Sequence, residues 1–572
     1  MLEKKDTLIR NGEIYSIGLD GQVKIWEAAV IRGETFIYVG NEADAAKITG
    51  STCDEIDLKG RTMLPAFADS HLHVSSAVEL LECCCLYDTV SAETEGRGEI
   101  IKAYQAAIKN DLQENPQKNV IRGVGWNPAL FLGSREGNPT AKDLDEVCAD
   151  RPVMLVSYDH HYLWVNSIAL EQAGINKRTD DPRNGILERD KEGNPTGIFQ
   201  ETPAIDLFKA RHPLGDYTVE EYRRGIDYYQ KTFGAPLGTL LTFDASHTEN
   251  AIHAYTEMAR EGKLNMRVRG VYVANPADPM SQIDRIIRRK GRDNVGELFR
   301  IDTVKFFIDG SGTSFYLEEP FEEKFIDRFN LPQGYRGYPQ WELGELKAAF
   351  DKLCRAGFQI HAHCMGDGAV RQALDAFYAC REISAQKDLR HTIAHLMLVR
   401  EPDLRRMAEL SIIGAIQPMW CYYDSGNLLE EDVLFGKRRS YGEYPFGKLE
   451  KEGVRLTAGT DFPVDLWPNP FIGMKVGATR TIYKTHPEYK RFKGRSLGPS
   501  ENKMTLKGLL QAYTINSAYQ MFLEEKTGTI EAGKSADFVI LDSRLSETEA
   551  ENLDEVKVEQ TYFRGECVYR KK

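Results

Sequence analysis

Pro65-Ala66-Phe67-Ala68-Asp69-Ser70-His71-Leu72-His73 is an apolar run that ends in two histidines separated by one residue. It predicts a strand over residues 64–70. Alternate side chains of a strand share a face, so His71 and His73 would point the same way and could bind one cation. Taken alone, such a pair is more typical of a polar turn, because short motifs often match by chance. Its interpretation depends on what the rest of the chain brings beside it.

Apolar strand patterns alternate with helical patterns through the middle of the chain, which is typical of a parallel sheet or barrel. Residues 343–353, for example, repeat apolar side chains at the spacing of a helix. Eight strands separated by helices predict an α/β fold, a (β/α)8 TIM-like barrel. The strands are expected at residues 64–70, 239–245, 267–273, 302–309, 358–363, 391–395, 412–417 and 454–460.

Two regions lie outside this pattern. Residues 75–235 form one long insertion after the first strand, and we expect it to cover the active-site face as a lid, since that face carries the functional loops of a barrel. Both ends of the chain are rich in strand-forming residues and turn signals, which predicts a small β-sandwich domain built from both termini. The expected domains are residues 1–63 and 521–572 for the sandwich and 64–520 for the barrel.

Composition and charge limit the expected partners. The chain has 572 residues, 42% of them hydrophobic, and a formal net charge of -13. The acidic balance argues against a nucleic-acid-binding surface, and no apolar run has the length of a membrane span. The charged start at residues 1–6 shows no signal peptide, so a cytoplasmic protein is expected. We therefore expect a small-molecule substrate, no nucleic acid, no membrane and, at most, a second copy of the chain in a homodimer.

Metal-binding types of side chain stand at the C-terminal ends of predicted strands one, five, six and eight. Strand five ends in His361-Ala362-His363, strand six ends at His395, and Asp461 follows strand eight. The C-terminal ends of barrel strands converge, so these side chains are expected to lie together. Histidine and aspartate suit zinc, and less often iron or manganese. Either His361 or His363 could serve on strand five.

Strand four carries a lysine, Lys305, inside an apolar run. A buried ammonium group is costly, so the pKa of Lys305 would fall and leave a neutral amine. A neutral amine can react with carbon dioxide to give a carbamate, which could bridge two metal ions as a carboxylate does. The alternative is an ordinary amine paired with Asp309 or another carboxylate.

The chain carries a set of motifs spread from its first barrel strand to its last strands. They are Pro65 to His73, Lys305-(x)3-Asp309-Gly310, His363-Cys364-Met365-Gly366-Asp367, His395, Gly459-Thr460-Asp461-Phe462-Pro463, Tyr158 to Ser167 and Gly528 to Asp537. Together they resemble the amidohydrolase superfamily and, more narrowly, the amidohydrolase 3 (YtcJ-like) group, which includes N-substituted formamide deformylases. The resemblance covers nearly the whole chain.

The resemblance implies a site for one or two divalent metal ions, zinc first. The two histidines of strand one would bind one ion and those of strands five and six the other, with the lysine as an N-carboxylated bridge. On strand five it favours His363, which directly precedes the Cys-Met-Gly-Asp run, over His361. The metal ligands implied are His71, His73, Lys305, His363, His395 and Asp461.

The reaction expected from these residues is hydrolysis of a non-peptide C–N bond in an amide or formamide. A metal-activated water would attack the carbonyl carbon, and Asp461 would carry its proton to the leaving nitrogen. His161, in the insertion, would stabilise the oxyanion. Substrate contacts are expected from His161, Trp164, Trp420 and Asp309. Trp420 could instead only close the barrel mouth, and His160 stands where the group often has glycine.

Other interpretations stay open at this point. The same site could deaminate a ring or cleave an ester or lactone, because one fold hosts many chemistries. A non-catalytic regulatory protein on a hydrolase scaffold is a further alternative, although a degenerate site usually loses some of its ligands. Glu188 and Glu201 follow two similar turns in the insertion. Each is expected either to contact the substrate or to lie in a solvated turn.

Overall fold

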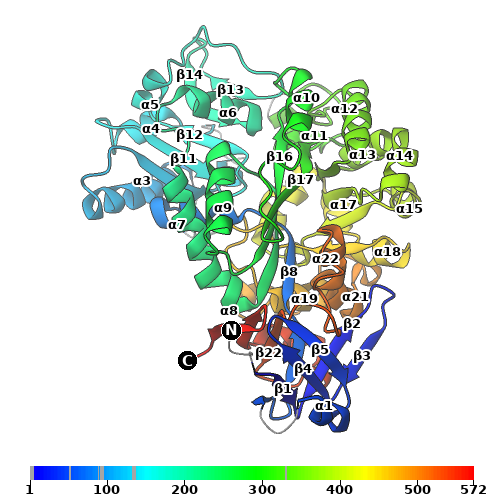
Figure 1. Ribbon diagram of the computed structural model, residues 1–572. Coiled ribbons are helices and arrows are strands. Elements are labelled where there is room, and N and C mark those ends of the chain that lie inside the picture. Colours follow the sequence, from blue (N-terminus) through cyan, green and yellow to red (C-terminus); the bar gives the residue numbers. More distant parts are fainter. Residues whose placement is uncertain are drawn as a thin grey trace.

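The computed structural model describes residues 5–49, 53–87, 89–90, 94, 96–131, 137–328 and 331–572. A central barrel carries a strand-rich insertion at one end and a small pair of sheets at the other (Figure 1). Within the described ranges, none of the helices combines the length and apolar character needed to cross a bilayer. The charged residues 1–4 lie outside the described part of the chain.

The barrel is an eight-stranded parallel sheet whose strands neighbour one another in chain order, which confirms the predicted fold class. Each of the eight expected strands is present, with ends shifted by a few residues. The strands are β8 (Phe67–Leu72), β15 (Thr239–Asp244), β16 (Arg267–Ala274), β17 (Phe299–Phe307), β18 (Gln359–Cys364), β19 (Thr392–His395), β20 (Ile413–Ile416) and β21 (Leu456–Ala458).

The first and last strands close the barrel at its C-terminal end. The amide of Asp461 donates to the carbonyl of His71 at 2.8 Å, and the amide of His73 donates to the carbonyl of Phe462 at 2.7 Å. Gly459 allows this approach, because a Cβ there would lie 2.7 Å from both the nitrogen and the oxygen of His71. Closure therefore brings the two ends of the predicted metal site side by side.

Helices surround the barrel and bury one large apolar core against the outer face of its strands. The helix expected at residues 343–353 runs from Leu343 to Ala356 and ends at Gly357 in the left-handed conformation, which stops a helix without strain. The surrounding helices are α7 (Val219–Tyr229), α9 (Glu249–Arg260), α10 (Ser281–Arg288), α12 (Leu343–Ala356), α13 (Asp367–Ala379), α14 (Arg381–Lys387), α15 (Glu401–Glu409), α18 (Phe446–Lys451), α19 (Pro470–Thr479), α21 (Leu506–Ala512) and α22 (Ile515–Gln520).

Both ends of the chain meet in two small sheets, where blue and red ribbons lie together in Figure 1. The expected strand at 64–70 is in fact two strands, since β7 belongs to this region and only Ala66 separates it from β8. One sheet is β5-β4-β1-β6 and the other β24-β23-β22-β7-β2-β3. Their bounds are β1 (Thr7–Arg10), β2 (Glu13–Ile17), β3 (Val23–Trp26), β4 (Ala28–Arg32), β5 (Thr35–Gly40), β6 (Asp54–Asp57), β7 (Thr62–Pro65), β22 (Phe538–Leu541), β23 (Val558–Phe563) and β24 (Glu566–Arg570).

The insertion after β8 has its own six-stranded sheet and its own apolar clusters. It lies at the C-terminal end of the barrel, away from the small sheets (Figure 1). Its strands are β9 (Cys84–Cys85), β10 (Ile121–Trp126), β11 (Val153–Ser157), β12 (Tyr162–Val165), β13 (Ile186–Arg189) and β14 (Pro195–Gln200). Its main helices are α3 (Arg97–Glu114), α4 (Ala141–Asp145), α5 (Ser167–Gln172) and α6 (Glu201–Arg211).

Candidate active site and metal centre

Three of the predicted ligands converge at the C-terminal end of the barrel. One donor atom each from His71, His395 and Asp461 lies within 4.8 Å of the other two, and all three residues are buried. Oδ1 of Asp461 is 3.4 Å from Nε2 of His71 and 3.0 Å from Nε2 of His73. Two imidazoles and a carboxylate facing one point are a donor set that fits a divalent metal ion such as zinc.

Three imidazoles of this site, those of His71, His363 and His395, are held in the neutral form that a metal ligand requires. Burial lowers the pKa of His71 and of His363 well below the usual range, and it lowers the pKa of His395 to about 3. Burial would raise the pKa of Asp461, but the hydrogen bond and charge of His73 outweigh it, so this pKa falls to about 2. The site therefore offers neutral nitrogen and ionised oxygen donors.

Of the two histidines on β18, one faces the site and the other lies beneath it. Nε2 of His361 is 2.7 Å from Nδ1 of His71, and its ring stacks on Phe243 at 4.7 Å. The ring of His363 instead lies 4.6 Å from that of His395 and lines the cavity. His361 is thus a positioning residue for His71, and His363 occupies the place of the expected ligand.

Asp309 is buried away from the cavity in which a substrate would lie, which does not fit the expected substrate contact. Its side chain is fully buried, and Oδ1 lies 3.2 Å from Nδ1 of His363. The two oxygens also accept hydrogen bonds from the amides of Tyr316, Met365 and Gly366. With every contact made inside the protein, the carboxylate orients His363 in the way that outer carboxylates orient metal-binding histidines.

His395 is oriented by Gln417 and covered by Trp420. Oε1 of Gln417 lies 3.1 Å from Nδ1 of His395, which leaves Nε2 free to face the site. Trp420 stacks on the same imidazole at 5.7 Å with an interplanar angle of 6°, so it lines the pocket beside a predicted ligand. His395 and Asp461 both have positive φ, at 74° and 58°. Such backbone strain is common at functional sites and uncommon elsewhere.

Lys305 points into the centre of the barrel mouth. Its side chain is 1% exposed, and Nζ lies 3.4 Å from Nε2 of His71. Burial lowers the pKa of Lys305 to about 7, while the charge of Asp461 opposes this. No hydrogen bond joins its amine to Asp309, the carboxylate considered as its partner, among the residues described. Much of the lysine is therefore a neutral amine at pH 7.

The insertion contributes His161, which faces the barrel ligands. It is 9% exposed, its ring lies 5.6 Å from that of His363, and Nδ1 lies 2.8 Å from Oε2 of Glu201. Burial lowers the pKa of His161, but the charge and hydrogen bond of Glu201 outweigh it and raise the pKa to about 9. His161 is thus a cation aimed at the site. Glu201, considered above as a substrate contact or a solvated turn, is instead its buried partner.

The cavity over the predicted ligands has two arms, and the residues that line both are Asp159, His161, His363, His395, Asp461 and Val464. The first arm has a volume of about 220 Å³ and extends beneath the insertion, past His160, Glu79 and Lys209. The second has a volume of about 280 Å³ and extends past Trp420. His160 thus lies in the first arm, where its Nε2 is 3.5 Å from Oε2 of Glu79.

Trp164 lies in neither arm, so its expected substrate contact is wrong. It is fully buried in the apolar cluster of the insertion, 5.7 Å from Trp126, and its Nε1 donates to the carbonyl of Thr140 at 2.8 Å. The reason is strand alternation: Trp164 and Tyr162 face the core of the insertion sheet, while the site is reached from the loop before β12.

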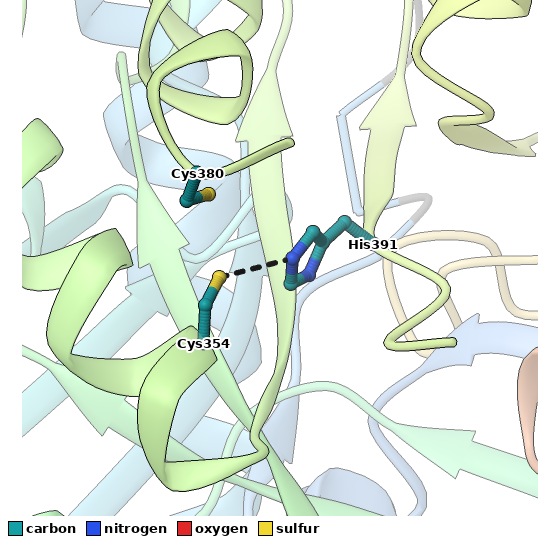
Figure 2. Close-up of side chains that lie close together, drawn as sticks. All are labelled: Cys354, Cys380 and His391. Carbon is teal, nitrogen blue, oxygen red and sulfur yellow. Dashed lines mark hydrogen bonds between the residues drawn. The ribbon is translucent and has the colours of Figure 1, made fainter. Parts of the chain in front are cut away.

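A second cluster of possible ligands lies near the opposite end of the barrel strands (Figure 2). Sγ of Cys354 is 3.3 Å from Nε2 of His391, and Cys380 lies beside them. The amide of Ile360 donates to Nδ1 of His391 at 3.0 Å. That bond requires a lone pair on Nδ1, so the neutral ring carries its proton on Nε2 and donates to the sulfur. His391 is therefore not arranged to bind a metal through Nε2.

Comparisons with known proteins agree with this architecture. The chain is 25% identical over 580 residues to an N-substituted formamide deformylase of Arthrobacter pascens, covering 100% of this chain and 99% of the relative. It is 26% identical to the putative amidohydrolase YtcJ of Bacillus subtilis (strain 168), covering 91% of each chain. A crystal structure of an uncharacterized metal-dependent hydrolase from Pyrococcus furiosus matches 96% of this chain and 100% of its own, with a TM-score of 0.67 and 25% identity.

The match to a family extends over nearly the whole sequence. The family model described as "Amidohydrolase family" matches residues 54–569, a range that contains the entire barrel, the insertion and strands β6, β7, β22 and β23 of the small sheets. The chain is therefore an enzyme of the amidohydrolase family.

Proposed function

We propose that the protein hydrolyses a non-peptide C–N bond, of the amide or N-substituted formamide type, in a small molecule. The observation that carries this proposal is the convergence of His71, His395 and Asp461 within 4.8 Å of one another, opposite the cationic His161. We further propose zinc as the metal, because buried imidazole and carboxylate donors suit it. A bound zinc would supply a Lewis acid for the carbonyl oxygen and would lower the pKa of water.

Asp461 is the proton carrier in this proposal. Its low pKa, about 2, keeps the carboxylate ionised at neutral pH, so it can accept the proton that the attacking water loses. The same carboxyl then returns the proton to the leaving nitrogen. Closure of the barrel holds Asp461 for this purpose, since its amide is bonded to the carbonyl of His71.

His161 stabilises the negative charge that develops on the carbonyl oxygen. Its imidazolium is fixed by Glu201, and a preorganised cation costs no rearrangement when the oxyanion forms. The amine of Lys305 would be N-carboxylated by carbon dioxide, turning a buried amine into a carboxylate that could join the ligands. Support for this step comes from the depressed pKa of Lys305 and its position 3.4 Å from His71.

The test is turnover by zinc-reconstituted protein on a panel of N-substituted formamides, amides, esters, lactones and aminoheterocycles. We expect hydrolysis of a formamide or amide, and loss of that activity in Asp461→Asn at unchanged substrate binding. Turnover confined to the esters, lactones or aminoheterocycles would overturn the choice of bond. Stoichiometric zinc with no turnover on any member would overturn catalysis itself.

A further inference from the structure

The second arm of the active-site cavity, beside Trp420, is lined by an unusual combination of side chains. Carboxylates and aromatic rings make up most of its lining, and no lysine or arginine lines it among the residues that the structure describes. We refer to it as the acidic arm. Its carboxylates besides Asp461 are Asp159, Asp424, Glu430, Glu431, Glu443 and Asp465.

Glu443 is the most buried of these carboxylates, and only one of its two carboxylate oxygens has a hydrogen-bond partner. The residue has no exposed surface, and its Oε1 accepts a hydrogen bond from Nδ2 of Asn427 at 2.9 Å. Its Oε2 is buried with no hydrogen-bond partner in the described structure, and the same holds for Oε2 of Glu431. A buried acceptor without a partner is costly, so each of these oxygens would be stabilised by a positively charged group from outside the chain.

The protein itself neutralises little of this charge. His161 lines the arm, but its imidazolium is paired with Glu201. The guanidinium of Arg480 donates to the backbone carbonyls of Glu443 at 2.9 Å and of Tyr444 at 3.0 Å rather than to a carboxylate. Burial raises the pKa of Glu443 above the usual range despite Arg480, and burial followed by the charges of Glu443 and Glu430 raises that of Glu431. These carboxyl groups therefore resist ionisation when the arm is empty, and a cation bound beside them would favour their charged forms.

Aromatic faces stand beside the carboxylates. Trp420 contacts Tyr444 edge to face at 6.3 Å, and Tyr158 and Tyr422 line the same space. Aromatic faces attract organic cations, and the attraction grows when the cation loses water. Because Trp420 also stacks on His395, this aromatic wall begins directly at the predicted metal ligands.

We propose that the acidic arm binds an organic ammonium group carried by the substrate, a few bonds away from the scissile C–N bond. This inference rests on the proposed function for the reacting end of the molecule. The unpartnered oxygens of Glu443 and Glu431 and the face of Trp420 would receive the ammonium, while the carbonyl lies over His71, His395 and Asp461. The enzyme would then act on amides or formamides of diamines whose second nitrogen carries a permanent or protonated positive charge.

A binding experiment tests the acidic arm without depending on hydrolysis of a substrate. Choline and 3,3-dimethylbutan-1-ol have the same shape and differ in charge, so isothermal titration of zinc-reconstituted protein with each reports the contribution of the charge. We expect choline to bind about tenfold or more tightly, as a desolvated cation–π contact allows. Equal affinity for the two alcohols would overturn the proposal.

Variants of Glu443 and Glu431 test whether the preference for choline arises in the acidic arm. Glu443→Gln and Glu431→Gln should each weaken choline binding several-fold and leave 3,3-dimethylbutan-1-ol unaffected. Glu188→Gln is the matched control, because Glu188 accepts hydrogen bonds from Asn138 and Gln200 inside the insertion and lines neither arm. Should Glu443→Gln fail to fold, Glu431→Gln gives the same answer. Unchanged choline binding in a folded arm variant, or equal loss in the control, would contradict the assignment.

Hydrolysis rates distinguish a failure of this inference from a failure of the proposed function. The N-formyl derivatives of 3-(trimethylammonio)propylamine and of its tert-butyl isostere are compared by kcat/KM. Preference for the cationic substrate, abolished in Glu431→Gln, supports both proposals. Hydrolysis of the two at equal rates overturns the acidic arm alone. Selective choline binding with no hydrolysis of either formamide supports the arm and counts against the proposed reaction.

Discussion

Nδ1 of His71 lies 2.7 Å from Nε2 of His361, so two fully buried imidazoles from β8 and β18 share one proton. For Nε2 of His71 to bind a metal, its Nδ1 must carry that proton and donate it to His361. The remaining nitrogen of His361, Nδ1, has no partner among the described residues. The contact with His361 thus fixes the orientation of His71, a predicted metal ligand, from within the core of the barrel.

Removing that acceptor should weaken the metal site. We expect His361→Leu to lower zinc affinity by about 10–100-fold, as loss of such an outer partner typically does. His361→Gln can still accept from His71 and should retain most of the affinity. Competition with a fluorescent chelator measures both. If the two variants bound zinc equally well, the positioning role of His361 would be wrong.

The location of the metal can be checked by elemental analysis of purified variants. His71→Asn combined with His395→Asn should remove bound zinc, since these residues supply the nitrogen donors that converge with Asp461. Cys354→Ser combined with Cys380→Ser should leave the zinc content unchanged, because the tautomer of His391 does not suit metal binding at that cluster. Zinc lost only in the cysteine variant would reverse the assignment of the two sites.

The pH dependence of activity should report His161. Glu201 raises the pKa of His161 to about 9, so the imidazolium persists through neutral pH and is lost as the pH rises past that value. Glu201→Gln removes the charge that raises it, so the alkaline limb of kcat/KM should move to lower pH. The ion pair also stabilises the fold below the unfolded pKa of about 6.5, and this contribution is lost as the pH rises through about 9. An unshifted alkaline limb in a folded Glu201→Gln protein would exclude His161 as its origin.

Carboxylation of Lys305 should depend on carbon dioxide. Burial lowers the pKa of this lysine to about 7, which leaves a reactive amine at neutral pH. We expect apoprotein incubated with ¹³C-bicarbonate and zinc to show a carbamate signal that is absent in Lys305→Met. Activity should return faster with bicarbonate present than in carbon-dioxide-free buffer. Full activation without any carbamate signal would leave Lys305 as an ordinary amine.

Two tryptophans provide a contrast between packing and binding. Trp164→Phe removes a fully buried indole and its hydrogen bond to Thr140, so it should lower the free energy of unfolding by about 1–3 kcal/mol and leave KM unchanged. Trp420→Phe, in the wall of the cavity, should change KM with little effect on stability. Urea unfolding and steady-state kinetics on the best formamide measure the two effects. If Trp164→Phe changed KM and left the free energy of unfolding unchanged, Trp164 would be a substrate contact after all.

The sequence predicted the barrel because each strand is a local apolar run and the strands follow one another in chain order. It also predicted the convergence of His71, His395 and Asp461, since closure of any such barrel brings strand ends together. The errors arose where the direction of a side chain decides its role. Asp309 and Trp164 are of types that often contact substrates, but contacts far apart in the sequence turn them inward.

The partners of the ligands were also beyond the sequence. Glu201, the first residue of α6, contacts His161 because its backbone, with φ of 68°, changes direction directly after β14 and places its side chain against the loop before β12. Gln417 follows β20 and contacts His395 on the neighbouring strand β19, whereas His361 on β18 contacts His71 on β8 across the barrel. No local pattern encodes such pairs. A sequence reveals them only when the arrangement and register of the barrel strands are known.

The single residue between β7 and β8 has a consequence for how the enzyme is made. Ala66 donates its amide to the carbonyl of Asp537, and Leu64 pairs with Val539, so the segment that leads into His71 is anchored by a region that follows every barrel strand in the chain. The other neighbour of His71, Asp461, is also made late. His71, a predicted metal ligand, therefore cannot take a fixed position until the barrel and β22 have been synthesised, and the protein should acquire a metal only after that point.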